Sequence, residues 1–183
     1  MRMRIIELQR STTWSAEFLA EAADIRAALE ALVVEVHHIG STAIPGIAAK
    51  PIIDILLEVS SLDQLDLSAH LIEHLGYEAL GEFGLAGRRY FRKGGEQRTH
   101  HIHGYESAHP DIQRHLAFRD YLKENREAAM QYESVKLAAA KEFRDSPEGY
   151  AQRKSPTIVR LEKEALLWAA RFSGDEAGRD FAL

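Results

Sequence analysis

Residues 37–59 read HHIGSTAIPGIAAKPIIDILLEV, and this stretch decides the fold because it places a polar turn between two strand-forming runs. The runs, 33–39 and 52–59, are rich in β-branched residues and have the length of ordinary strands. The segment between them contains Gly40, Ser41, Pro45 and Gly46, which are typical of turns. The stretch therefore predicts a strand, a tight turn and a second strand.

The turn and the second strand carry groups suited to phosphate chemistry. Gly40 lets the backbone approach a ligand closely, and the N–H and hydroxyl groups of Ser41 and Thr42 can point at one anion. Asp54 lies within an apolar strand, where an unpaired buried carboxylate is unfavourable, so it should face a cation, a cleft or a hydrogen-bonding partner. Nucleotidyltransferase sites have this layout, in which the turn holds a triphosphate and strand carboxylates hold magnesium.

The pattern of residues in this stretch is more specific than that of a general phosphate-binding turn. It closely resembles the signature of the GrpB family in the segments HIGST (38–42), PG (45–46) and AAKPIIDI (48–55). Further landmarks that resemble the family are LGY (75–77), HHIH (100–103) and FRDYL (118–122). The resemblance covers roughly residues 10–170. It implies a branch of the nucleotidyltransferase superfamily, and the same module is also found fused to dephospho-CoA kinase in some bacteria.

Composition bounds the class of protein. A chain of 183 residues can bury a sufficient core as one domain, and the absence of cysteine excludes disulfides, thiolate zinc sites and a cysteine nucleophile. The 23 basic and 28 acidic residues give a net charge of −5, which argues against a general nucleic-acid binder. No apolar run approaches a membrane span and the first residues lack an apolar signal core, so we expect a cytoplasmic protein without a membrane partner.

Hydrophobic periodicity predicts a mixed part followed by a helical part. Apolar residues recur every three or four positions between residues 14 and 32, which predicts an amphipathic helix that packs on the sheet. A short edge strand is expected within residues 1–10. The further predictions are a helix at 62–75, strands at 77–80, 88–93 and 98–105, and helices at 111–123, 126–144 and 155–172.

These elements predict a single domain that spans residues 1–173. Residues 1–106 should hold the N-terminal helix and a mixed sheet, and residues 107–173 should form a helical half. Residues 174–183 have lost the helical pattern and are expected to form a flexible tail. The expected fold class is α+β, and the resemblance makes it a nucleotidyltransferase-like mixed β-sheet flanked by helices.

Asp54 is the candidate catalytic residue and magnesium ligand. Nucleotidyltransferases usually carry two carboxylates two residues apart on one strand, because such side chains share a face and can bind the same metal pair. Leu56 stands at the second position here, which departs from many members of the family. One carboxylate together with substrate phosphates can still hold a magnesium ion.

His101 and His103 form a second candidate metal site. Their spacing of two places them on one face of a strand, where a pair of imidazoles can hold a transition metal or orient phosphate oxygens. If their strand pairs with that of Asp54, they would occupy the place of a third acid. Two hydrogen-bonded histidines in a half-buried sheet are the simpler interpretation, and zinc is only a minor hypothesis because the sequence shows no third ligand.

Several basic residues are candidates for neutralising a phosphate. Arg88, Arg89 and Arg98 fall within eleven residues and predict a positive wall for a phosphate-bearing ligand. A solvated hairpin face explains them equally well. Lys50 precedes a proline and should be extended at the mouth of the Asp54 strand, where it reaches either a phosphate or a strand carboxylate.

Together these expectations describe a GrpB-like protein that binds a nucleotide or another phosphorylated small molecule. The turn 40–42, Lys50 and the arginines would contact phosphate, and Asp54 would hold magnesium. Nucleotidyl transfer is the reaction that the resemblance implies. A catalytically silent binding module, favoured by Leu56, is the alternative, and metal-dependent hydrolysis through the histidine pair is a third. The sequence makes no prediction of an oligomeric state.

Overall fold

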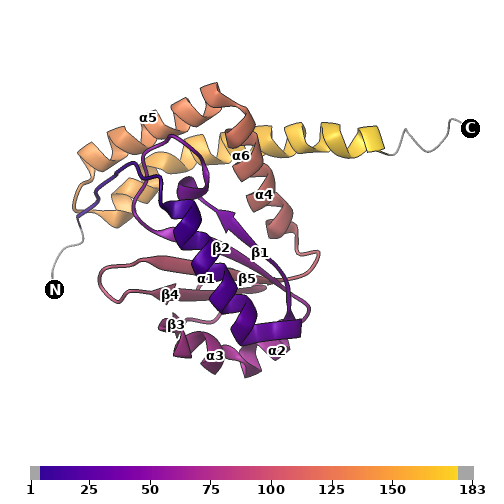
Figure 1. Ribbon diagram of the computed structural model, residues 1–183. Helices are drawn as coiled ribbons and strands as arrows, with labels where there is room; N and C mark the ends of the chain where they lie inside the picture. The colour runs from indigo at the N-terminus through magenta and orange to yellow at the C-terminus, as the bar shows by residue number, and fades with distance from the viewer. Residues whose placement is uncertain (1–4, 177–183) are drawn as a thin grey trace, which may run out of the picture. The chain divides into compact units, whose positions relative to one another are not determined.

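The computed structural model describes residues 5–176, and the chain divides into two compact units (Figure 1). One unit is Leu8–Ile112. The other unit is made of residues 113–176 together with residues 5–7. The strands belong to the first unit, whereas the second is helical.

The first unit contains a five-stranded sheet in the order β1-β2-β5-β4-β3. The strands are β1 (Val33–Ile39), β2 (Ile53–Val59), β3 (Tyr77–Ala79), β4 (Arg88–Lys93) and β5 (His100–Glu106). The central pair β2 and β5 is parallel, and the other three pairs are antiparallel. The predicted mixed sheet and α+β class are therefore confirmed. Because β2 and β5 are joined by two other strands and two helices, their neighbouring positions are not evident from local patterns.

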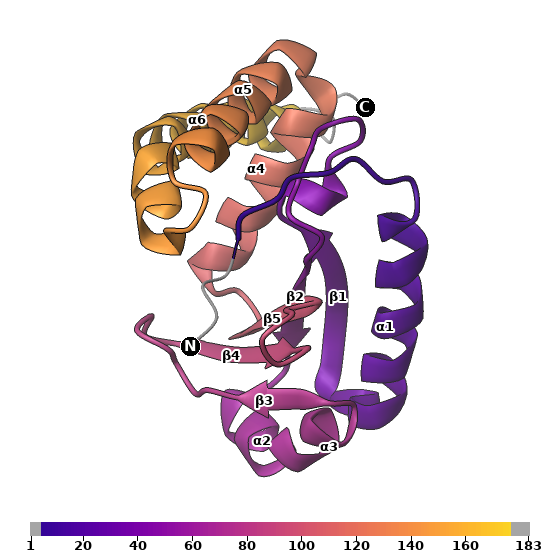
Figure 2. The same ribbon diagram turned by 90° about the vertical axis from the view of Figure 1, so that its left-hand side faces the viewer.

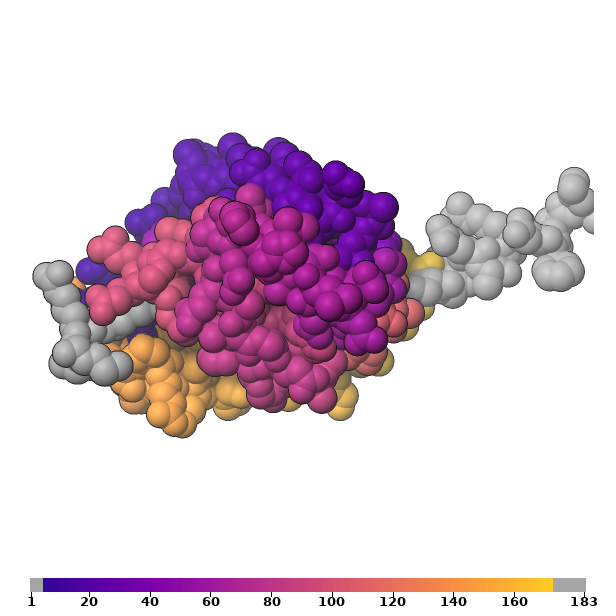
Figure 3. All heavy atoms as spheres, turned by 90° about the horizontal axis from the view of Figure 1, so that it is seen from below, coloured from indigo at the N-terminus to yellow at the C-terminus, as the bar shows by residue number. Residues whose placement is uncertain are grey.

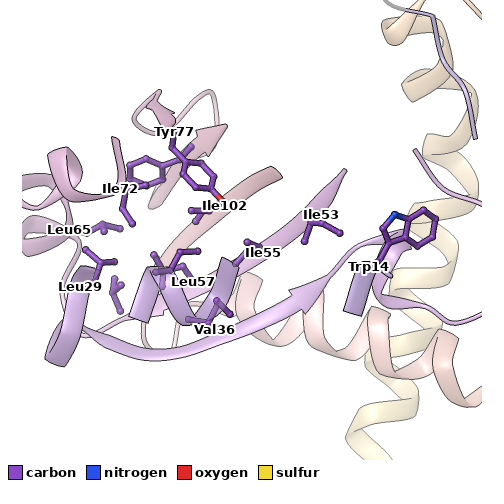
Figure 4. Packing of buried hydrophobic residues seen from close by; sticks show 14 of the residues in the cluster. Trp14, Leu29, Val36, Ile53, Ile55, Leu57, Leu65, Ile72, Tyr77 and Ile102 are labelled. Atoms are coloured by element: carbon purple, nitrogen blue, oxygen red, sulfur yellow. The ribbon is translucent and has the colours of Figure 1, made fainter. Parts of the chain in front are cut away.

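Three helices cover one face of this sheet. They are α1 (Trp14–Leu29), α2 (Leu62–Leu67) and α3 (Ala69–His74). Figure 2 shows α1 running alongside β1, and α1 also contacts α3. In Figure 3 the indigo atoms of the N-terminal part of the chain border the magenta atoms. Alternate residues of β2, including Ile53, Ile55 and Leu57, point into the core beneath these helices (Figure 4). The residues between them, including Asp54, therefore face the other side of the sheet.

Two local predictions in this unit need correction. The helix predicted at 62–75 is interrupted at Ser68, where the backbone leaves helical geometry and α2 gives way to α3. Ser61 caps α2 by accepting a hydrogen bond from the N–H of Gln64 at 3.3 Å, and Gly76 follows α3 with a φ of +92°. The edge strand expected within residues 1–10 is reduced to one bridge between Gln9 and Ala49, and residues 1–4 lie outside the described residues.

The helical part consists of three long helices. These are α4 (Pro110–Glu124), which begins in the first unit, α5 (Arg126–Glu142) and α6 (Pro147–Glu176). Asn125 caps α5 by accepting a hydrogen bond from the N–H of Ala128 at 3.1 Å. Phe118 of α4 packs edge-on against Tyr132 of α5, with ring centroids 5.5 Å apart. The three predicted helices are therefore present, and two of them have nearly the predicted bounds.

The last helix is longer than predicted. It begins at Pro147 rather than near residue 155, and Pro156 lies inside it. The sequence signal at Pro156 is that of a helix start, because proline suits a first turn, but the preceding turns are helical as well. The helix also includes residues 174–176 of the expected tail, while residues 177–183 lie outside the described residues. Between residues 5 and 176, no helix has the length and apolar character needed to cross a membrane.

Candidate functional site

The turn after β1 lies directly against Asp54 of β2. Ile39, the last residue of β1, pairs with Asp54, and Gly40 then turns the chain with φ +70° and ψ −169°. A Cβ atom on Gly40 would lie 2.6 Å from Oδ2 of Asp54, much closer than side chains tolerate. The structure thus brings the Gly-Ser turn and the strand carboxylate together, and it explains why glycine occupies position 40.

Asp54 also meets both histidines of β5. The parallel register pairs Asp54 with His101. Nδ1 of His101 donates to Oδ1 of Asp54 at 3.2 Å, and Nε2 of His103 lies 3.7 Å from the same oxygen. The side chain of Asp54 keeps 30% of its surface exposed. Oδ1 therefore faces the histidines, whereas Oδ2 faces the turn.

These contacts determine the charge of Asp54. Burial raises the pKa of the carboxyl group, but the hydrogen bonds and charges of His101 and His103 outweigh it and hold the pKa below its ordinary value. Asp54 is therefore ionised near neutral pH. A carboxylate that is kept anionic on a rigid strand is a suitable ligand for a hard cation such as magnesium.

The position of a second acid is occupied by buried Leu56. Its side chain is 0% exposed and lies on the same face as Asp54, between His37 of β1 and His103 of β5 in the sheet register. Glu58, two residues further along, lies 3.8 Å from Nε2 of His37. Among the described residues, no group of three or more histidine, aspartate or glutamate side chains is arranged to hold a metal ion. A metal at Asp54 would consequently need ligand atoms from a substrate or water.

Thr42 and Ser41 have different surroundings within the turn. Thr42 is buried, its hydroxyl lies 2.9 Å from Nε2 of His38, and it donates to the carbonyl of Ile52 at 3.4 Å. This hydroxyl therefore connects the turn to both adjoining segments. Ser41 is half-buried and opens the short 3₁₀ turn Ser41–Ala43. Lys50, also half-buried, precedes β2 at the same end of the strand.

The structure does not gather the three candidate arginines around Asp54. Arg88 is 8% exposed and donates to the carbonyl of Phe83 at 2.8 Å, so it supports the loop before β4. Arg89 points to the helical face and binds Asp66 of α2 with both ends of its guanidinium, one contact being 2.6 Å. Arg98 donates to the carbonyl of Gly95 within its own loop. Each arginine thus has a structural contact, and Arg88 also lies over the ring of Tyr90, 5.0 Å from its centroid, so the positive wall stays a prediction.

Sequence reasoning missed Tyr90, an aromatic residue beside the histidines. Its ring centroid lies 5.5 Å from that of His101 and 5.3 Å from that of His103. Phe83 stacks on the same ring, with centroids 5.0 Å apart and an interplanar angle of 13°. Strand alternation offered a signal, because Tyr90 and the core residue Phe91 must point to opposite faces of β4.

The fold and the site define an α+β protein with a mixed sheet, in which one strand aspartate lies between a Gly-Ser turn and a histidine pair. The chain belongs to the GrpB family, described as GrpB protein, whose model matches residues 5–164. The family indicated by the sequence is therefore confirmed.

Individual relatives agree with this membership. The crystal structure of the conserved protein GrpB from Enterococcus faecalis is 42% identical, with a TM-score of 0.86 over 89% of this chain and 99% of that one. UPF0157 protein YqkA of Bacillus subtilis is 43% identical over 85% of this chain and 45% of its own length. UPF0157 protein PA4798 of Pseudomonas aeruginosa is 39% identical over 89% of this chain and 68% of its own length. The chain thus spans less than half of the Bacillus subtilis relative.

Proposed function

We propose that this protein binds a nucleotide or another phosphorylated small molecule together with magnesium, at the place where the Gly40–Ser41 turn meets Asp54. The observation that supports this most is the approach of Gly40 to Oδ2 of Asp54. A phosphate contacted by the turn would be close enough to share a cation with the carboxylate. The geometry supports this pairing because β1 and β2 are adjacent antiparallel strands, which hold both groups on a rigid frame.

The charge distribution supports a divalent cation rather than direct phosphate binding by Asp54. An ionised carboxylate repels phosphate, so a cation must lie between them. Magnesium is commonly held by one or two carboxylates plus substrate phosphates and keeps several waters. With Oδ1 bonded to His101, Oδ2 is the oxygen that we assign to the cation. The hydroxyl of Ser41 and the ammonium of Lys50 are the assigned phosphate contacts.

Binding without transfer is the form of the proposal that the site supports better. Two-metal nucleotidyl transfer requires a second carboxylate beside the first, and buried Leu56 occupies that position. Nucleotidyl transfer, the reaction that the family resemblance implies, remains the second candidate, with one magnesium and Asp54. Hydrolysis through a histidine-bound metal is not proposed, because both histidines surround Oδ1 of Asp54.

The experiment is isothermal titration calorimetry with ATP and UTP, each with and without magnesium. Asp54→Asn keeps the size of the side chain and removes its charge, so it should abolish the magnesium-dependent part of binding. Glu58→Gln is the matched control, because Glu58 lies on the same face of β2 but meets His37. It should leave binding unchanged. Equal binding by wild type and Asp54→Asn in magnesium would refute the proposal.

A second assay separates silent binding from transfer. Release of pyrophosphate from the bound nucleoside triphosphate should be absent in the wild type if the module only binds. Magnesium-dependent release that disappears in Asp54→Asn and persists in Glu58→Gln would establish transfer instead.

A further inference from the structure

The loop that precedes β4 presents an aromatic ring to solvent in an unfavourable backbone conformation. Phe83 is 57% exposed and has a φ of +44°. Bulky side chains rarely adopt this left-handed region, which glycine adopts freely. Exposure and backbone preference would both favour another residue at this position.

The loop is nevertheless well supported. The buried guanidinium of Arg88 donates to the carbonyls of Phe83 at 2.8 Å and of Glu82 at 3.3 Å. The carboxylate of Glu82 accepts a hydrogen bond from the N–H of Gly87 at 2.8 Å, and Leu85 donates to the carbonyl of Glu82 at 3.1 Å. These bonds within the loop hold Phe83 in position from both sides. Its exposure is therefore a feature of an ordered loop.

The ring of Phe83 is continuous with the candidate site. One face stacks on Tyr90, which in turn contacts the rings of His101 and His103, and these surround Asp54. Because one face of Phe83 is covered by Tyr90, its exposed surface is chiefly the opposite face and the ring edge. A planar group placed there would extend the row of rings away from the carboxylate.

We infer that Phe83 is a stacking platform for the nucleobase of the ligand, with Tyr90 as the residue that positions it. This inference rests on the function proposed above, and it selects nucleotides among the phosphorylated small molecules. Stacking on an aromatic face is open to every base, because each base has a π-face. The site should therefore discriminate weakly between bases and strongly against ligands without one.

The test compares ATP with inorganic tripolyphosphate, which carries the phosphates without base or sugar, both in the presence of magnesium. Wild type should bind ATP at least ten-fold more tightly than tripolyphosphate. Phe83→Gly should weaken ATP binding about ten-fold, the effect of losing one base–aromatic stack, and leave tripolyphosphate binding unchanged. Phe83→Trp keeps an aromatic face and should retain ATP affinity.

Two controls exclude a structural explanation. Leu85→Ala removes an exposed apolar side chain from the same loop without removing a stacked ring, and it should leave both affinities unchanged. Phe83→Gly loses the stack on Tyr90 but relieves the strain of the positive φ, so the melting temperature should change little. Unchanged ATP affinity in Phe83→Gly would overturn the platform alone. Failure of the wild type to bind either ligand with magnesium would overturn both this inference and the proposed function.

Discussion

Replacing Gly40 by alanine tests whether the turn and Asp54 are held in contact. The new Cβ would lie 2.6 Å from Oδ2 and 3.0 Å from Cβ of Asp54. The backbone at φ +70° and ψ −169° also lies in a region that is almost restricted to glycine. Backbone strain of about 1–3 kcal/mol and a comparable overpacking cost together predict a loss of about 3 kcal/mol in the free energy of unfolding.

Gly46→Ala is the matched control for this prediction. Gly46 has a φ of +79°, but a Cβ there would meet nothing within 4 Å. Gly46→Ala should therefore lower the free energy of unfolding only by the cost of backbone strain, about 1 kcal/mol. Urea unfolding followed by circular dichroism measures both, and calorimetry with ATP and magnesium should show weaker binding for Gly40→Ala only. If both variants lose the same stability and bind alike, the assigned contact between the turn and Asp54 is wrong.

Three further predictions concern charged residues. The pKa of Asp54 is held below its ordinary value, so its stabilising effect is complete above about pH 4 and is lost as pH falls through the lowered pKa. In Asp54→Asn, the free energy of unfolding should therefore fall less steeply at acid pH than in the wild type. Urea titrations at several pH values measure this difference. Lys93→Met leaves the buried carboxylate of Glu21 without its 2.8 Å partner and should lower the free energy of unfolding by about 3 kcal/mol. Adding Glu21→Gln removes the unpaired charge, so the double variant should regain part of this loss. Arg89→Met removes a partly exposed pair with Asp66 on the helical face, and it should cost about 1 kcal/mol or less without changing ATP affinity. A larger stability loss in Arg89→Met than in Lys93→Met would contradict this ranking.

The elements that the sequence predicts well are those whose own residues specify them. The bounds 33–39 and 88–93 agree with β1 and β4, and α4 and α5 begin within a residue of their predicted starts. In each case the periodicity and the capping or turn residues lie inside the element. The errors fall where local signals conflict. Ser68 interrupts a continuous apolar stripe, and Pro156 resembles a helix start although α6 already contains nine residues before it.

The candidate site depends on a different kind of information. Side chains alternate between the two faces of a strand, and this was enough to place Asp54 on one face of β2 and both histidines on one face of β5. Whether these faces meet depends on the parallel pairing of β2 with β5, which connects residues 47 positions apart. The arginines show the same limit, since their charge predicts phosphate contacts, but Arg88 and Arg89 are used by neighbouring loops and helices.

The sequence by itself determined the family, the strand–turn–strand unit and the absence of a second acid beside Asp54, because these are properties of residue type and short spacing. Only the tertiary structure decided that Asp54 meets His101, that Tyr90 and Phe83 continue the row of rings, and that Arg89 binds Asp66 on the helical face. The physical reason is that side-chain partners follow from strand order and register. Those are set by burial summed over the whole core rather than by any local segment.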